Sequence, residues 1–280
     1  MEDEYPIESA NHFKAVKAMA LYNNSFVTVS EGSKFNFKLW NYSTTSYKLT
    51  LVDEKSVSFF SILKSGYLSF WATVFIPPPA KSTTVHIAAV GADPFSLYIV
   101  PITSQGKLGT VFRSKDEHSN NITTIMLSED KKQLITGSMD STIKIWTLTN
   151  NHDQVEDNTT TIATKNGPIR CGLQDKTGTY YAFGHSSNIF NNLVNITIWK
   201  TDPKHGLVKL AQNVAGEAHE SNLTGLVLTH DEKYLISLSE SGQMRLWRLE
   251  NWTMVDLMAS LGLGIFDATI LATESNKILL

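Results

Sequence analysis

Apolar and polar residues alternate in short runs along much of the chain. Residues 142–146 (TIKIW) and 243–247 (QMRLW) show the alternation most clearly. A period of two is typical of a strand in a sheet whose two faces have different surroundings. Polar segments between the apolar runs, such as 130–132 and 231–233, predict hairpin turns. The pattern therefore predicts an all-β chain of short antiparallel strands.

The chain also repeats itself. Residues 121–146 align with residues 222–247 without a gap, and a histidine precedes each segment. A spacing of 28 residues between histidine and tryptophan occurs in three pairs: His118 and Trp146, His219 and Trp247, and His12 and Trp40. A single sheet of three or four strands cannot bury both of its faces, so we expect the repeated units to stack.

Four tryptophans keep a longer period. Trp146 and Trp199 are 53 residues apart, and Trp199 and Trp247 are 48 apart. Trp40 and Trp146 are 106 residues apart, which is two steps of 53. The gap predicts a further repeat that lacks a tryptophan, and the apolar residues of 86–100 are its candidate.

This pattern resembles the WD40 family. Repeats of that family carry a histidine before the first strand, an aspartate in the turn between the second and third strands, and a tryptophan at the end of the third. His118, Asp140 and Trp146 match these positions, with Thr136 or Ser138 as the hydroxyl partner. The resemblance implies a hydrogen-bonded network that makes each sheet, or blade, rigid.

The match is good in the repeats that end at Trp146 and Trp247 and partial in those that end at Trp40 and Trp199. Ser241 replaces the turn aspartate in the last repeat, so we expect a complete network only around His118. The resemblance implies a structural role for the following residues: His118, Thr136, Ser138, Asp140, Trp146, His219, Trp247, His12, Trp40 and Trp199.

The implied architecture is an all-β, WD40-type β-propeller with five recognisable blades, taken as one domain over 1–280. We expect the blades at 12–56, 57–117, 118–162, 163–212 and 213–255, and a partial sixth at 256–280. Residues 266–280 align with the start of the fifth blade, and 4–8 offer an outer strand. Three explanations are open: a blade completed by a partner, a piece of a longer protein, or an open propeller. We expect the polar segment 150–164 and the segment 185–193 to be looped-out insertions.

Charge and composition narrow the possible partners. The net charge is −3, which argues against a broad electrostatic surface for nucleic acid. Cys171 is the single cysteine, so an intrachain disulfide and a cysteine-rich zinc site are both excluded. We expect no cofactor and no metal, because the eight histidines are scattered and no phosphate-binding glycine motif is present. The acidic N-terminus carries no apolar run, so we expect a cytoplasmic or nuclear protein without membrane attachment.

One set of residues suggests an enzyme. Ser61 and Lys64 form S-x-x-K, Ser119 and Asn121 form S-x-N, and residues 176–178 read K-T-G. These motifs resemble those of serine acyl-transfer enzymes, in which a lysine activates the serine nucleophile. The flanks of Ser61 form no helical face, however, and the other two motifs lie inside predicted repeats.

The sequence therefore favours a non-catalytic scaffold or adaptor that binds other proteins. The alternative is a propeller that a partner's strand or blade completes near 256–280, as a structural subunit of a coat, pore or Elongator-like assembly. The resemblance to the WD40 family implies that the turns between the second and third strands form the binding face, since contact residues of that family often lie there. These turns nominate five residues: Glu31, Asp93, Met139, Asn188 and Glu240.

Overall fold

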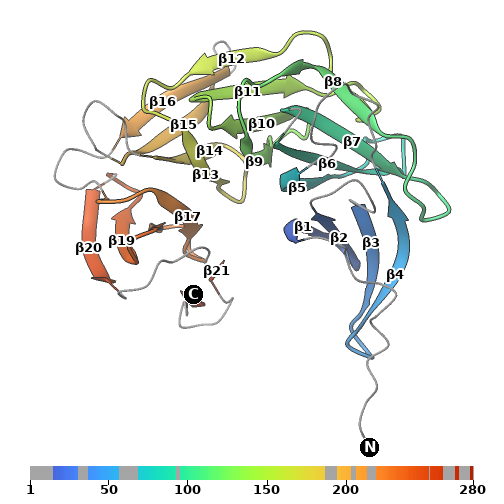
Figure 1. Cartoon of the computed structure of the whole chain (residues 1–280), viewed down its shortest axis with the longest axis horizontal. Helices are drawn as coiled ribbons and strands as arrows, with labels where there is room; N and C mark the ends of the chain where they lie inside the picture. Colours follow the sequence, from blue (N-terminus) through green and yellow to red (C-terminus); the bar gives the residue numbers. More distant parts are fainter. Residues whose placement is uncertain are drawn as a thin grey trace, which may run out of the picture. The chain divides into compact units, whose positions relative to one another are not determined.

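A computed structural model describes most of the chain (Figure 1). The described residues are 15–30, 37–56, 69–92, 95–186, 194–202, 206–212, 219–251, 253–260, 269–270 and 278–279. Strands and turns make up all of these ranges, so none of them contains a helix of membrane-spanning length and apolarity. The chain divides into two compact units, Met1–Glu117 with Leu148–Asp157, and His118–Thr147 with Asn158–Leu280.

The first unit contains two four-stranded antiparallel sheets whose strands follow chain order. The first sheet consists of β1 (Val16–Tyr22), β2 (Ser25–Ser30), β3 (Phe37–Ser43) and β4 (Lys48–Lys55). The second consists of β5 (Ser69–Ile76), β6 (Val85–Ala92), β7 (Ser96–Ile102) and β8 (Phe112–Glu117). The second sheet is the repeat without a tryptophan, and its third strand carries Val100 near the position where the first sheet carries Trp40.

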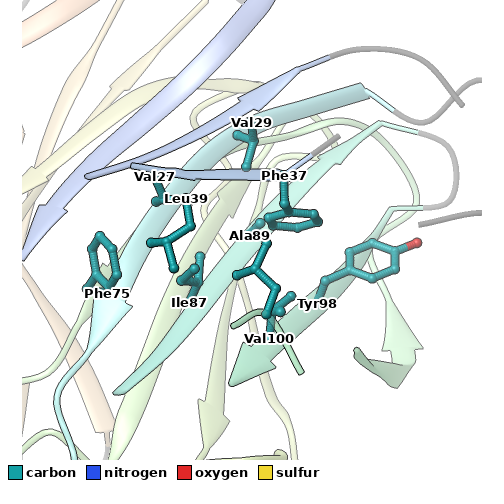
Figure 2. Close-up of a cluster of buried hydrophobic side chains, with 10 residues drawn as sticks. Val27, Val29, Phe37, Leu39, Phe75, Ile87, Ala89, Tyr98 and Val100 are labelled. Atoms are coloured by element: carbon teal, nitrogen blue, oxygen red, sulfur yellow. The ribbon is translucent and has the colours of Figure 1, made fainter. Parts of the chain in front are cut away.

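A buried apolar cluster joins the two sheets of this unit (Figure 2). Val27, Val29, Phe37 and Leu39 come from the first sheet and are at most 3% exposed. They face five buried side chains of the second sheet, which are Phe75, Ile87, Ala89, Tyr98 and Val100. Alternate residues of β2 and β6 supply this face, as the period of two predicts.

The second unit contains three more four-stranded sheets and a two-stranded hairpin. The third sheet consists of β9 (Ile122–Leu127), β10 (Gln133–Ser138), β11 (Thr142–Thr147) and β12 (Thr160–Ala163). The fourth consists of β13 (Ile169–Gln174), β14 (Tyr180–His185), β15 (Ile196–Asp202) and β16 (Gly206–Gln212). The fifth consists of β17 (Leu223–Leu228), β18 (Tyr234–Ser239), β19 (Gln243–Arg248) and β20 (Thr253–Ser260). The hairpin pairs β21 (Thr269–Ile270) with β22 (Ile278–Leu279).

These three sheets are joined in chain order by two apolar cores. Ile135 and Ile143 of the third sheet pack with Phe183 of the fourth in one core. Ile198 of the fourth sheet packs with Leu235 of the fifth in the other. Each sheet thus buries one face against the next, which is how stacked repeats that are unstable alone support one another.

The strand pairing repeats from sheet to sheet, as the sequence does. In all five sheets the pairing of the first two strands shifts by one residue at the same place, near the start of the first strand. Because the shift recurs, it shows which residues at the end of the second strand are equivalent in the different sheets. Ser30, Ser138, His185 and Ser239 are therefore equivalent positions, although their side chains differ.

The strands can be compared with the expected blade ranges. Each of the five sheets starts inside its range, while β12 ends at Ala163, one residue past 162, and β20 ends at Ser260, five past 255. The hairpin of β21 and β22 lies where a sixth blade was expected. The single domain over 1–280 stays a prediction.

The expected insertion at 150–164 is partly wrong. Its last part is β12, the outer strand of the third sheet. Its first part packs within the first unit, where His152 is only 8% exposed and its Nδ1 lies 3.0 Å from the carbonyl oxygen of Pro77. Lys115 also donates a 2.8 Å hydrogen bond to Asp157. A polar segment is therefore held against the protein by long-range contacts that its own sequence does not reveal.

Candidate protein-binding face and the relays behind it

Four of the five sheets share one hydrogen bond. The indole nitrogen of a tryptophan on the third strand donates to a threonine or serine hydroxyl of the same sheet. The pairs are Trp40 and Thr28 (2.9 Å), Trp146 and Thr136 (2.9 Å), Trp199 and Thr197 (2.9 Å), and Trp247 and Ser237 (2.7 Å). A buried indole N–H needs such an acceptor, because leaving it unpaired costs about 1–3 kcal/mol.

The third sheet extends this bond into a relay of side chains. The hydroxyl of Thr136 lies 2.8 Å from Nε2 of His118, and Nδ1 of His118 lies 2.8 Å from a carboxylate oxygen of Asp140. These contacts fix the direction of donation. Trp146 donates to Thr136, the hydroxyl of Thr136 donates to Nε2 of His118, and Nδ1–H of His118 donates to Asp140. Ser138 lies outside this relay, because its hydroxyl contacts the carbonyl oxygen of Asn121.

Burial favours the neutral form of the imidazole in this relay. It lowers the pKa of His118, although the neighbouring Asp140 acts in the opposite direction. Burial alone would raise the pKa of Asp140, but hydrogen bonds from His118 and Thr142 outweigh it and hold that pKa below its usual value. Asp140 also accepts from the backbone N–H groups of Ser119 and Thr142. A charged carboxylate therefore ties the segment before β9 to the turn between β10 and β11.

The fifth sheet has the same relay without its last member. The hydroxyl of Ser237 lies 2.6 Å from Nε2 of His219 and accepts the indole N–H of Trp247. Ser241 stands at the position of Asp140, and Nδ1 of His219 has no hydrogen-bond partner among the described residues. Burial, with a smaller contribution from Arg245, lowers the pKa of His219 to about 3.

The fourth sheet contains a relay that the sequence analysis missed. Nε2 of His185 lies 2.9 Å from the hydroxyl of Thr197, which accepts the indole N–H of Trp199. Nδ1 of His185 lies 2.9 Å from the carbonyl oxygen of Gly167. Burial lowers the pKa of this histidine to about 4. Among the described residues, only the relay of His118 ends on a carboxylate, whereas that of His185 ends on a backbone carbonyl. His185 ends β14 instead of opening an insertion.

Register explains how the relay changes strands. Phe183 occupies the place of Thr136 in the fourth sheet, and Thr197 lies opposite Phe183 on the neighbouring strand. The hydroxyl has therefore moved from the second strand to the third. The histidine has moved from the segment before the first strand to the end of the second. The dipeptide Gly184-His185 before Thr197-Ile198-Trp199 was the available signal.

The first sheet keeps the indole bond, from Trp40 to Thr28. Thr28 is 8% exposed and pairs across the strands with Lys38, as Thr136 pairs with Lys144. His12 lies outside the described residues.

Two of the five residues nominated for the binding face lie in the described part of the chain. Met139 and Glu240 lie in the turns after β10 and β18, and each donates its backbone N–H to the residue before the first strand of its sheet, Asn121 or Asn222. Glu240 also accepts from Arg170 at 2.6 Å and from the side chain of Asn222 at 2.9 Å. Glu31, Asp93 and Asn188 lie outside the described residues.

Arg170 connects two sheets at this end. It is the second residue of β13 in the fourth sheet, whereas Glu240 follows β18 in the fifth. Both side chains remain about one-third exposed. The two turns and this ion pair form a pre-arranged, largely polar surface, which we call the relay-end face (Met139, Arg170, Asn222 and Glu240). The side chain of Asp140 is only 6% exposed and supports this surface from behind.

Two of the three enzyme-like motifs lie in the described part of the chain, and they are far apart. Ser119 contacts Asp140 at the relay end of the sheets, while Lys176 lies in the turn between β13 and β14 and bonds Glu232. A strand of about six residues, roughly 20 Å, separates these two ends. Ser61 and Lys64 lie outside the described residues. No cluster of three or more metal-ligating side chains occurs in the described ranges.

The repeated sheets and their indole relays define the fold class of the protein: it is all-β, and its four-stranded antiparallel sheets are like the blades of a WD40 β-propeller. The family model of the WD domain, G-beta repeat, matches residues 109–147. That segment contains the complete relay of the third sheet.

Relatives agree with this class. The chain is 25% identical to target of rapamycin complex subunit wat1 of Schizosaccharomyces pombe over 200 residues, which cover 60% of this chain and 62% of the relative. Two crystal structures of Sqt1 from Chaetomium thermophilum superpose with TM-scores of 0.64 and 0.65 at 14% identity. They cover 92% of this chain and 62% and 63% of theirs. The Sqt1 likeness shows the fold alone, and the chain spans about three-fifths of the length of each relative.

Proposed function

We propose that this chain is a non-catalytic scaffold that binds other proteins as a subunit of a multiprotein complex. The observation that carries the proposal is the use of three buried histidines. His118, His185 and His219 each bond the hydroxyl that accepts an indole N–H, so the residues best suited to acid–base chemistry at neutral pH serve to fix strands.

Rigidity favours this role. A surface that is already ordered loses less conformational entropy on binding, so more of the contact energy appears as affinity. The relay-end face has its turns fixed by Asp140 and by the pair of Arg170 and Glu240. The name of the fission yeast relative identifies it as a complex subunit, which makes the target of rapamycin complex the first assembly to test.

Affinity purification of the tagged chain, followed by mass spectrometry, tests the proposal. We expect a defined set of proteins to co-purify in stoichiometric amounts. The double variant R170A/E240A should lose at least part of this set, while K132A should keep it, because Lys132 is exposed in a turn at the opposite end of the third sheet. The proposal fails if the chain purifies without stoichiometric partners.

A second candidate is a subunit whose propeller a partner completes. The supporting observation is an apolar surface on the edge strand β1, where Met19 is 65% exposed, Leu21 is 64% exposed and Val16 is 47% exposed. Clustered exposed apolar side chains often mark a protein interface. Hydrogen exchange in the purified complex distinguishes the candidates. Slower exchange in β1 and in 256–280 supports completion by the partner, and unchanged exchange in both contradicts it.

A further inference from the structure

The core between the fourth and fifth sheets opens into a groove at the end opposite the relay-end face. The groove has a volume of about 750 Å³. Residues of β13, β14, β15 and β16 and of the turn after β13 form one wall. Residues of β17 and β18, of the turn between them and of the end of β19 form the other. We call it the β14–β18 groove.

Apolar and aromatic side chains form the interior of the groove. Leu173 and Ile198 line it from the fourth sheet, and Leu235 lines it from the fifth. At the mouth, Leu210 is 48% exposed and Tyr180 is 37% exposed. This surface continues the buried core outward, which is the setting in which a partner's apolar side chain gains most from burial.

The acidic groups of the groove are largely occupied by local bonds. Asp175 accepts from the backbone N–H groups of Thr179 and Tyr180, which fixes the turn between β13 and β14. Glu232 accepts from the backbone N–H of Lys176 at 2.7 Å and so joins the turns of the two sheets. Glu250 is the remaining acidic side chain of the lining and is exposed.

The basic groups at the mouth are more available. Arg248 lines the groove, is exposed, and has no ion-pair partner among the described residues. Lys233 is 74% exposed, and its Nζ is 4.0 Å from Asp231, at the limit of an ion pair. Lys200 lies 5.4 Å from the ring centre of Tyr180 and has no carboxylate partner in the described part of the chain. The available charge at the mouth is therefore mainly positive and surrounds an apolar interior.

We propose that the β14–β18 groove binds a short acidic segment of a partner protein. One large apolar side chain of the segment would insert among Tyr180, Ile198 and Leu235. Acidic residues beside it would pair with Arg248 and Lys233, and such pairing of opposite charges increases both specificity and association rate. The inference rests on the proposed function, because it assigns a second contact surface to the scaffold.

A random twelve-residue peptide library displayed on phage and selected against the full chain tests the inference. We expect the enriched peptides to combine Asp or Glu with Leu, Phe, Trp or Met. The most enriched peptide, labelled with fluorescein, then serves as the probe in fluorescence polarisation. R248E and L210S should each weaken its binding by about tenfold or more, because they reverse a charge and remove an apolar contact.

Both substitutions are at exposed side chains, so the fold is expected to persist. K132E is the matched control, since it reverses an exposed charge in a turn of the third sheet and should leave binding unchanged. The groove assignment is overturned if no peptide is enriched, if basic peptides are enriched, or if R248E and L210S bind the probe as the parent chain does. If the peptide test fails while the chain still co-purifies with partners, only the groove assignment is wrong and the scaffold function is retained. If the chain purifies without partners, the scaffold function itself is refuted.

Discussion

The hydroxyl oxygen of Thr197 lies 2.9 Å from Nε2 of His185 and makes in the fourth sheet the contact that Thr136 makes with His118 in the third. The two threonines come from different strands, and so do the two histidines. The contact is therefore retained although the residues that make it occupy different sequence positions. It is the arrangement around the indole, and not a fixed motif, that repeats from sheet to sheet.

Removing the hydroxyl of this relay should destabilise the protein. In T197V the indole N–H of Trp199 and Nε2 of His185 both lose their partner inside the fold. Two unpaired buried groups predict a loss of about 2–3 kcal/mol in the free energy of unfolding. Urea denaturation followed by tryptophan fluorescence measures it. T160V changes an exposed threonine of β12 and should cost less than about 0.5 kcal/mol. Equal stability of the two variants would contradict the role of Thr197.

The incomplete relay of the fifth sheet can be completed. S241D places a carboxylate where the third sheet has Asp140, within reach of Nδ1 of His219 by analogy with the 2.8 Å contact of His118. A charge-assisted hydrogen bond predicts a gain of about 1 kcal/mol and a higher pKa for His219. Thermal denaturation and NMR titration measure the two effects, with S241A as the control. The prediction is wrong if S241D is no more stable than S241A.

Acid should weaken the fold before carboxylates begin to titrate. The pKa values of His185 and His219 are lowered to about 4 and about 3 by burial, against an ordinary value of 6.5. Both histidines are neutral in either state above pH 6.5. Between pH 6.5 and about 4 the unfolded chain binds protons that the folded chain excludes. Stability is therefore full above pH 6.5 and falls as the pH decreases.

The expected slope is roughly 1.4 kcal/mol per pH unit for each histidine. Urea denaturation at pH 7, 6 and 5 gives the slope, and NMR of the imidazole carbons gives the native pKa values. Native titration of both rings near pH 6.5 would refute the burial argument.

Close approach of two turns makes Gly178 hard to replace. Its φ is +76°, and a Cβ there would lie 2.7 Å from the backbone nitrogen of Glu129. Gly106 has a similar φ of +72° with open space around it. We expect G106A to cost about 1 kcal/mol from backbone strain alone, and G178A to cost about 3 kcal/mol or more. Denaturation midpoints of the two variants separate the clash from the strain, and similar midpoints would show that the turns can move apart.

Sequence patterns predicted the sheets better than the contacts between them. The third and fifth sheets were readable because alternating strands end at Trp146 and Trp247 after equally spaced histidines. The second sheet was found without a tryptophan, because the apolar run before Val100 was sufficient. The relay of His185 was missed since a comparison by position cannot follow a hydroxyl that changes strands.

Contacts between residues far apart in the chain were also not predictable from the sequence. Glu240 was nominated as a partner-binding turn residue, and nothing in the sequence indicated its pairing with Arg170, 70 residues away. The burial of His152 against Pro77 spans 75 residues and had no local signal. Contacts of this kind depend on which sheets are neighbours, and a pattern within one repeat carries no information about that.

Three turns at the groove end of the second unit are joined in series. Thr179 of the fourth sheet donates to Glu129 of the third, and Glu232 of the fifth accepts from Lys176 of the fourth. A mechanical load applied to any one of these turns would be shared with its neighbours through side chains as well as through the core. A partner pulling on this edge would therefore meet the combined resistance of three sheets instead of peeling one away.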